Sequence, residues 1–92
     1  MRVDKFLKTA RILKRREAAK ELAEQGRVWV NGRQAKPGTN VEVGDRIKIR
    51  FGLRMVEVEV KQIVKQASKQ NAELLFEVLS EEKIDDNAGE NV

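Results

Sequence analysis

Cationic side chains crowd one short segment of this sequence, Arg11 to Arg16, and groups of this type bind phosphate. The segment reads Arg-Ile-Leu-Lys-Arg-Arg. If a helix begins near Arg15, cations stand at its N-terminus, where the peptide dipoles already present positive charge and each cation costs a few tenths of a kcal/mol. Folding alone would favour Ser, Thr or Asp there. Because free helix N–H groups and arginines together hold anions, we interpret the segment as a phosphate site rather than a charge run that aids solubility.

Charge is distributed unevenly along the chain, which carries a net charge of +4. The first 36 residues contain eleven lysines and arginines against four acidic residues, and the rest of the chain contains eight against eleven. A basic half of this kind favours a polyanion, so nucleic acid is the leading partner. The expected RNA-binding residues are Arg2, Lys5, Lys8, Arg11, Lys14, Arg15, Arg16 and Lys20.

The composition argues against most catalytic sites. The chain has no cysteine and no histidine, which removes thiolate and imidazole chemistry and the two commonest zinc ligands. It has no phosphate-loop pattern, and a core this small surrounds no sizeable substrate pocket. We therefore expect no enzyme, no catalytic residue, no metal and no cofactor. No apolar run reaches the length of a signal peptide or a transmembrane helix, so we expect a cytoplasmic protein without a membrane partner.

Two short helices are predicted at the start of the chain. In the first, apolar residues recur at i, i+3, i+4 and i+7, at Val3, Phe6, Leu7 and Ala10. The second should run from about Arg15 to Gln25, with an inward face of Ala18, Ala19, Leu22 and Ala23. Gly26 follows at the place where a left-handed C-terminal cap is usual.

After Gly26 the spacing of apolar residues becomes two, which predicts strands. Val28 and Val30 come first, and Asn31-Gly32 suits the tight type I′ turn of a hairpin. Pro37-Gly38 is predicted to form the centre of a type II turn. We therefore expect Gly26, Asn31 and Gly32 to serve as structural turn residues.

Alternation predicts three later strands. Apolar residues at 47, 49 and 51 alternate with cations at 46, 48 and 50, and valines at 56, 58 and 60 alternate with glutamates at 57 and 59. If residues 51–54 turn a hairpin, those cations lie beside the glutamates, which favours structural pairing over RNA contact. A last strand should run from about Leu74 to Leu79, while residues 61–72 are ambiguous. The expected fold is α+β, with two packed N-terminal helices and a small, mostly antiparallel β-sheet in one domain, 1–83, before a disordered acidic tail, 84–92.

Two single residues have roles that the sequence leaves open. Asp4 lies among cations at the start of the first helix, where it either caps that helix or forms an ion pair that orients Arg15 or Arg16. Trp29 points away from the face of its valine neighbours, and it either stacks on a base or packs within the protein.

Four segments, in order, resemble the S-four RNA-binding domain. They are Arg2-Val-Asp4-Lys5-Phe-Leu7, Lys14-Arg-Arg16-x-x-Ala19-Lys, Gly26-Arg-Val28-x-Val30-Asn31-Gly32 and Val43-Gly44-Asp45-x-Ile47. The resemblance covers about residues 1–51 and implies two packed helices followed by a strongly bent sheet, the alpha-L motif. It also implies that the basic helix face grips structured RNA at Arg2, Lys5, Arg11 and Arg16, with Asp4 matching the family's acid. The family often has Ser or Thr where this chain has Glu17, which removes a hydroxyl contact or a helix cap.

Within that family the chain is similar to the short ribosome quality-control factors P (RqcP) of Gram-positive bacteria, from Met1 to about Lys83. The resemblance implies a ribosome-associated RNA-binding protein, and we expect it to be a monomer that does not bind DNA. Such a factor binds large ribosomal subunits obstructed by peptidyl-tRNA, lies between rRNA and tRNA, and assists an RqcH-type tailing factor in adding alanines. The heat-shock ribosome-binding type also resembles the start of the chain and implies general ribosome recycling, but it usually has a long basic C-terminal extension.

A protein-interaction adaptor is the competing class of function. From Glu73 to Glu90 acidic residues outnumber the single lysine by seven to one, and a small sheet has unpaired edges. Either the acidic tail or a sheet edge would then dock a partner. Deletion of residues 84–92 tests the tail version.

Overall fold

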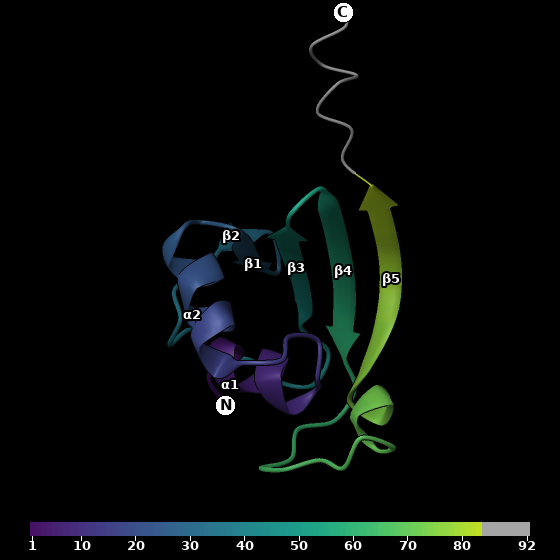
Figure 1. Cartoon of the computed structure of the whole chain (residues 1–92). Helices are drawn as coiled ribbons and strands as arrows, with labels where there is room; N and C mark the ends of the chain where they lie inside the picture. Colours follow the sequence, from purple (N-terminus) through teal and green to yellow (C-terminus); the bar gives the residue numbers. More distant parts are fainter. Residues whose placement is uncertain (84–92) are drawn as a thin grey trace, which may run out of the picture.

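Two helices followed by a five-stranded antiparallel sheet make up the described part of the chain, residues 1–83 of a computed structural model (Figure 1). The helices are α1 (Val3–Thr9) and α2 (Arg16–Glu24), and a 3-10 turn, η1 (Ala72–Leu75), comes before the last strand. The strands are β1 (Val28–Val30), β2 (Arg33–Gln34), β3 (Arg46–Phe51), β4 (Arg54–Val60) and β5 (Phe76–Lys83). Their order across the sheet is β2-β1-β3-β4-β5. The predicted α+β fold is confirmed, whereas the tail prediction lies outside the described residues.

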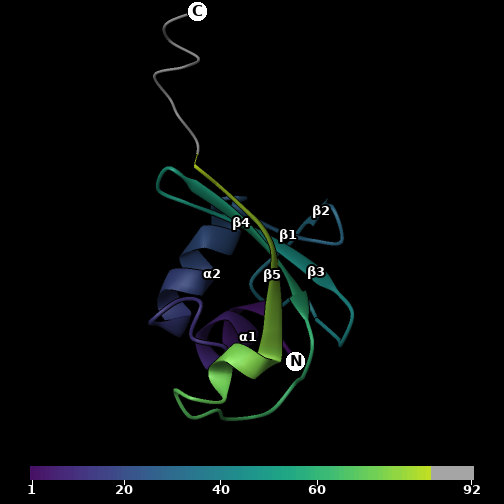
Figure 2. The same ribbon diagram turned by 90° about the vertical axis from the view of Figure 1, so that its right-hand side faces the viewer.

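The core lies between the two helices and one face of the sheet, and Figure 2 shows both helices on the same side of the strands. All four predicted core positions of α1 are buried, because their spacing puts them on one helix face. Alternate residues of β1, β3 and β4 complete the core, at Val28, Val30, Ile47, Ile49, Val56, Val58 and Val60. No helix among residues 1–83 is long and apolar enough to cross a membrane.

The end of α2 follows the sequence prediction. Gly26 takes a positive φ of 75°, and its N–H donates to the carbonyl of Ala23 at 3.0 Å. The N–H of Arg27 donates to the carbonyl of Leu22 at 2.9 Å. These two bonds form a Schellman motif, which satisfies the last carbonyls of the helix and turns the chain toward β1.

The hairpin between β1 and β2 turns at Asn31 and Gly32, whose φ angles are 51° and 83°. The side chain of Asn31 does more than tolerate this conformation. Its Nδ2 donates to Asp45 Oδ1 at 3.1 Å, and its Oδ1 accepts from the N–H of Arg46 at 2.9 Å. The turn is therefore tied to the start of β3.

The type II prediction for Pro37-Gly38 is wrong, because Gly38 lacks the positive φ that this turn requires. The N–H of Thr39 still donates to the carbonyl of Lys36 at 3.0 Å. The central peptide of the turn directs the carbonyl of Pro37 to the N–H of Asp4, 3.3 Å away at the start of α1. The need to satisfy α1 thus accounts for the orientation of this peptide.

The limits predicted for the last strand are also wrong, since β5 runs from Phe76 to Lys83. Leu74 and Leu75 belong to η1, where Leu75 is buried. The strand continues through polar residues because its backbone pairs with β4 as far as Arg54↔Lys83. A register irregularity between Glu57 and Val58 of β4 accompanies this pairing.

Candidate RNA-binding surface

The predicted RNA-binding cations all lie at the start of α1, on the helices or in the connection between them. All are exposed except Lys5, which is half-buried. They are Arg2 before α1, Lys5 and Lys8 on α1, Arg11, Lys14 and Arg15 in the connection, and Arg16 and Lys20 on α2. Because the apolar faces of both helices pack toward the sheet, most of these side chains remain available to a partner in solvent.

Asp4 is the one buried charged residue of the described chain, with 1% of its surface exposed. Its Oδ2 lies 3.1 Å from Arg2 Nη2 and 3.5 Å from Arg16 Nε. Its Oδ1 accepts from the N–H of Lys5 at 2.7 Å. Of the two interpretations of Asp4, the structure shows the ion pair, with Arg16 rather than Arg15, while the N-cap of α1 is Arg2 without a side-chain cap.

A shallow hollow of about 370 Å³ surrounds this carboxylate and is lined by Arg2, Asp4, Arg16, Glu17 and Lys20. The two arginines are about half exposed, at 52% and 47% of their side chains. Each therefore keeps N–H donors free for an anion while Asp4 holds its position. Glu17 reduces the positive charge of the hollow.

The start of α2 differs from that of α1. The first N–H groups of α1, those of Val3 and Asp4, donate to carbonyls of Thr39 and Pro37. In α2 the N-cap is Arg15, in extended conformation, and no side chain caps the first turn. The first-turn N–H groups of α2 thus lie beside Arg15 and Arg16, where an anion would interact favourably with both.

Comparison with known proteins shows that the helices and their cations belong to a known domain. Residues 1–47 match the S4 domain. They include α1, α2 and all the cations described above. The chain belongs to the S4-domain family.

Individual relatives match this chain over most of its length. A protein of Halalkalibacterium halodurans named RQC P-site tRNA stabilizing factor is 51% identical over 84 residues, which cover 91% of this chain and 96% of the relative. The factor of the same name from Bacillus subtilis is 45% identical over 84 residues, covering 91% and 98%. Among solved structures, Vibrio cholerae heat shock protein 15, described as trimeric, has a TM-score of 0.80 at 33% identity and covers 87% of this chain and 82% of that one.

Two cations of β3 lie opposite acidic residues of β4, which supports a structural role for them rather than RNA contact. Arg46 pairs in register with Glu59, and Lys48 with Glu57. The hydrogen bond from Lys61, at 2.6 Å, and its charge lower the pKa of Glu59, and the charge of Arg46 adds to the effect. The bonds to Glu59 and Glu77 raise the pKa of Lys61. These residues stabilise the strand pairs, and all except Arg46 lie outside the S4 match.

Trp29 lies on the face of the sheet opposite to the core, because Val28 and Val30 point inward. It is half-buried and lines a hollow of about 300 Å³ together with Gly32, Arg46, Lys48, Met55 and Glu57. This hollow is separate from the helix cations, and base stacking by Trp29 stays a prediction.

The sequence did not single out Lys65 and Gln66, yet both lie beside α1. They belong to the segment 61–71 between β4 and η1, and they border a hollow next to Lys8, Thr9 and Arg11. The sequence signal that could have placed this segment against the helices is its apolar residues, Ile63, Val64 and Ala67, which pack against the core.

Proposed function

We propose that this protein is an RNA-binding accessory factor of bacterial ribosome-associated quality control. It binds large ribosomal subunits obstructed by peptidyl-tRNA, contacts rRNA and the P-site tRNA, and assists RqcH-dependent alanine tailing of the stalled chain. It acts on the ribosome in the cytoplasm, as a monomer and without catalysing a reaction. The observation that carries the proposal is 51% identity across 91% of the chain to a factor whose name states that it stabilises P-site tRNA.

The structure supports a binding mechanism in which positioned cations meet RNA phosphates. Arg2 and Arg16 both pair with the carboxylate of Asp4 and carry planar guanidinium groups that match phosphate geometry. The other cations of α1, α2 and their connection widen the contact. Because backbone phosphates dominate affinity for RNA, this surface would recognise the shape of folded RNA rather than base sequence.

Sedimentation with purified ribosomal particles tests the proposal. The samples are intact ribosomes, empty large subunits, and large subunits that hold peptidyl-tRNA. We expect the protein to pellet selectively with the obstructed subunits, and Arg16→Ala to lower that binding about tenfold or more, since one charge-assisted phosphate contact is lost. The matched control is Arg33→Ala, which removes an exposed arginine of β2 that does not line the Asp4 hollow.

Other outcomes of that experiment decide between functions. Equal binding to all three particles would favour the general recycling role of the heat-shock type. Full binding and full alanine tailing by Arg16→Ala would show that the assignment of Arg16 to the RNA-binding site is wrong. Sedimentation of the protein alone tests its oligomeric state, and a mass above that of a single chain would contradict the monomer and agree with the trimer described for the Vibrio cholerae relative.

A second candidate function, a protein-interaction adaptor, is favoured by β5. This strand ends the sheet order and pairs only with β4 within the described residues. It exposes 50% of Val78 and 39% of Leu79 beside the acids Glu77, Glu81 and Glu82. An edge of this kind suits the addition of a basic, extended segment of a partner.

The edge is tested with Val78→Lys, because a lysine on an edge strand opposes the addition of a basic partner strand. The adaptor function predicts normal binding to obstructed subunits but loss of alanine tailing in the variant. Unchanged tailing would exclude this edge as a docking site.

A further inference from the structure

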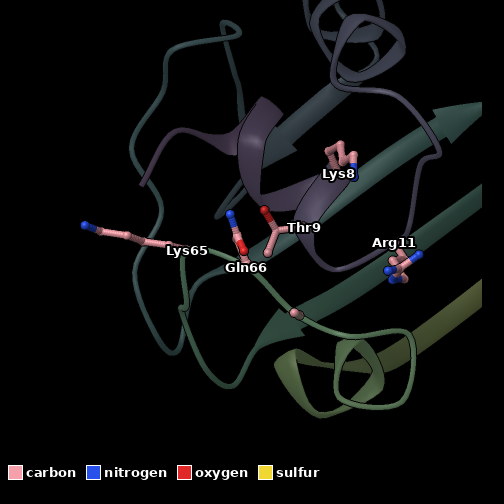
Figure 3. A pocket seen from close by; sticks show the side chains of 6 residues that line it. Lys8, Thr9, Arg11, Lys65 and Gln66 are labelled. Carbon is pink, nitrogen blue, oxygen red and sulfur yellow. The ribbon is translucent and has the colours of Figure 1, made fainter.

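The hollow next to the C-terminal end of α1 combines two segments that lie far apart in sequence. It has a volume of about 290 Å³ and is lined by Lys8, Thr9, Arg11, Lys65, Gln66 and Ala67. Figure 3 shows Thr9 and Gln66 close together, with Lys8 and Arg11 on one side and Lys65 on the other, its side chain extended outward. The lining contains three cations and no acid.

The segment that carries Lys65 is anchored on both sides of it. Ile63, Val64 and Ala67 are half-buried and pack against the core, whereas Lys65 and Gln66 between them are exposed. This places a cation beside α1 although Lys65 lies outside the S4-matched residues 1–47.

Arg11 has a backbone conformation that folding alone does not favour for arginine. Its φ is 57°, and its N–H donates to the carbonyl of Lys8 at 3.0 Å while that of Ile12 donates to the carbonyl of Leu7 at 3.0 Å. This is the same Schellman motif that ends α2, where the corresponding residue is Gly26. An arginine at the position where glycine is usual stores strain, which is common where a side chain has a binding role.

The polar side chains that line this hollow have no hydrogen-bond or ion-pair partner in the described part of the chain. None of the salt bridges within residues 1–83 involves Lys8, Arg11 or Lys65. None of the side-chain hydrogen bonds within this range involves Thr9 or Gln66. The Asp4 hollow differs, because there a carboxylate already occupies Arg2 and Arg16.

We infer that this hollow is a second site for the RNA backbone, in which Lys8, Arg11 and Lys65 contact phosphates. Thr9 and Gln66 lie between these cations, where their hydroxyl and amide groups reach phosphate or ribose oxygens. The site extends the RNA contact beyond the S4 match, onto the segment that joins β4 to η1. It rests on the proposed function only for the identity of the RNA.

The test compares full-length variants for binding to obstructed large subunits and, separately, to purified bulk tRNA. We expect Lys65→Ala to weaken binding about three- to tenfold and to reduce the slope of log K against log salt by about 0.7–0.9, the value for one phosphate. Lys65→Glu should weaken it further. The matched control is Lys69→Ala, which removes a lysine of the same segment that does not line the hollow.

Arg11→Gly separates binding from folding, because glycine suits the conformation at this position. We expect weaker RNA binding together with a urea unfolding midpoint that is unchanged or higher. A variant that binds weakly because it is misfolded would show a lower midpoint.

Each outcome decides the site separately from the proposed function. If the protein binds obstructed subunits, and Lys65→Glu and Arg11→Gly bind as well as the unaltered protein, the second site is wrong and the proposed function stands. If the protein binds tRNA but shows no preference for obstructed subunits, and the Lys65 variants bind tRNA weakly, the proposed function fails and the second site stands. Binding to neither RNA would overturn both.

Discussion

Asp4 is the residue on which the order of the cationic surface depends. Its carboxylate is buried, so it must be satisfied by partners, and it receives the N–H of Lys5 and the guanidinium groups of Arg2 and Arg16. Arg2 comes just before α1, whereas Arg16 is the first residue of α2. One carboxylate therefore joins the beginnings of both helices and fixes two arginines at the surface.

Asp4→Ala is expected to lower the free energy of unfolding by about 1–3 kcal/mol, because three charge-assisted contacts are lost and two arginines are left beside each other. The exposure of those arginines keeps the loss below that of a fully buried ion pair. Urea denaturation measures it. A loss smaller than about 0.5 kcal/mol, the range of an ordinary surface substitution, would contradict the structural role given to Asp4.

The sequence identified Asp4 as an exception among cations but did not decide its partner. A cap and an ion pair use the same carboxylate, and local spacing does not distinguish them. The distance from Asp4 to Arg16 depends on how α2 returns alongside α1, which is a tertiary property. Lys65 was missed for the same reason, because its place in the hollow next to α1 follows from the path of a long polar segment.

The two helices end in the same hydrogen-bonding pattern with different residues in the left-handed position. Gly26 has no β-carbon to strain the turn after α2. Arg11 carries its side chain in the same conformation after α1, at a cost of about 1–2 kcal/mol for an L-residue. The contrast between the two ends allows strain and function to be separated by experiment.

The matched prediction is that Gly26→Ala destabilises and Arg11→Gly does not. Gly26→Ala should lower the free energy of unfolding by about 1–2 kcal/mol, since its β-carbon also meets the side-chain amide of Gln34. Arg11→Gly should leave it unchanged or raise it by up to about 1 kcal/mol, because relief of strain offsets the loss of a cation near a helix C-terminus. Urea midpoints of both variants decide. Equal losses in the two would refute the interpretation of Arg11.

Sequence patterns predicted the elements well where one strong local signal was present. The period-two valines gave β1 and β4 their inward faces, and Asn31-Gly32 predicted the tight hairpin. Prediction failed where a distant group decided the geometry. The turn at Pro37-Gly38 serves the N–H groups of α1, and β5 extends past its apolar residues because β4 supplies backbone partners.

For the molecule as a whole, charge separates along the order of elements. The predicted RNA-binding cations lie at the start of α1, on the helices and in the connection between them, whereas the last strand of the sheet order, β5, carries Glu77, Glu81 and Glu82. Such an asymmetry turns the helix side toward a polyanion and the β5 side away from it.

Affinity for obstructed subunits should therefore fall steeply with salt. Each neutralised phosphate contributes a slope of about 0.7–0.9 in log K against log salt, so simultaneous contact by both hollows predicts a slope of several units. Binding isotherms between about 50 mM and about 200 mM salt measure it. A slope near zero would mean that affinity comes from contacts other than phosphate.

The segment 61–71 also has a consequence for how such proteins diversify. Its apolar anchors, Ile63, Val64 and Ala67, belong to the core, whereas the two residues between them, Lys65 and Gln66, touch solvent. Exchange of this pair changes the charge beside α1 and leaves the packing intact. Residues 65 and 66 thus offer descendants of one fold, or an engineer, a place to alter the proposed RNA contact without rebuilding the domain.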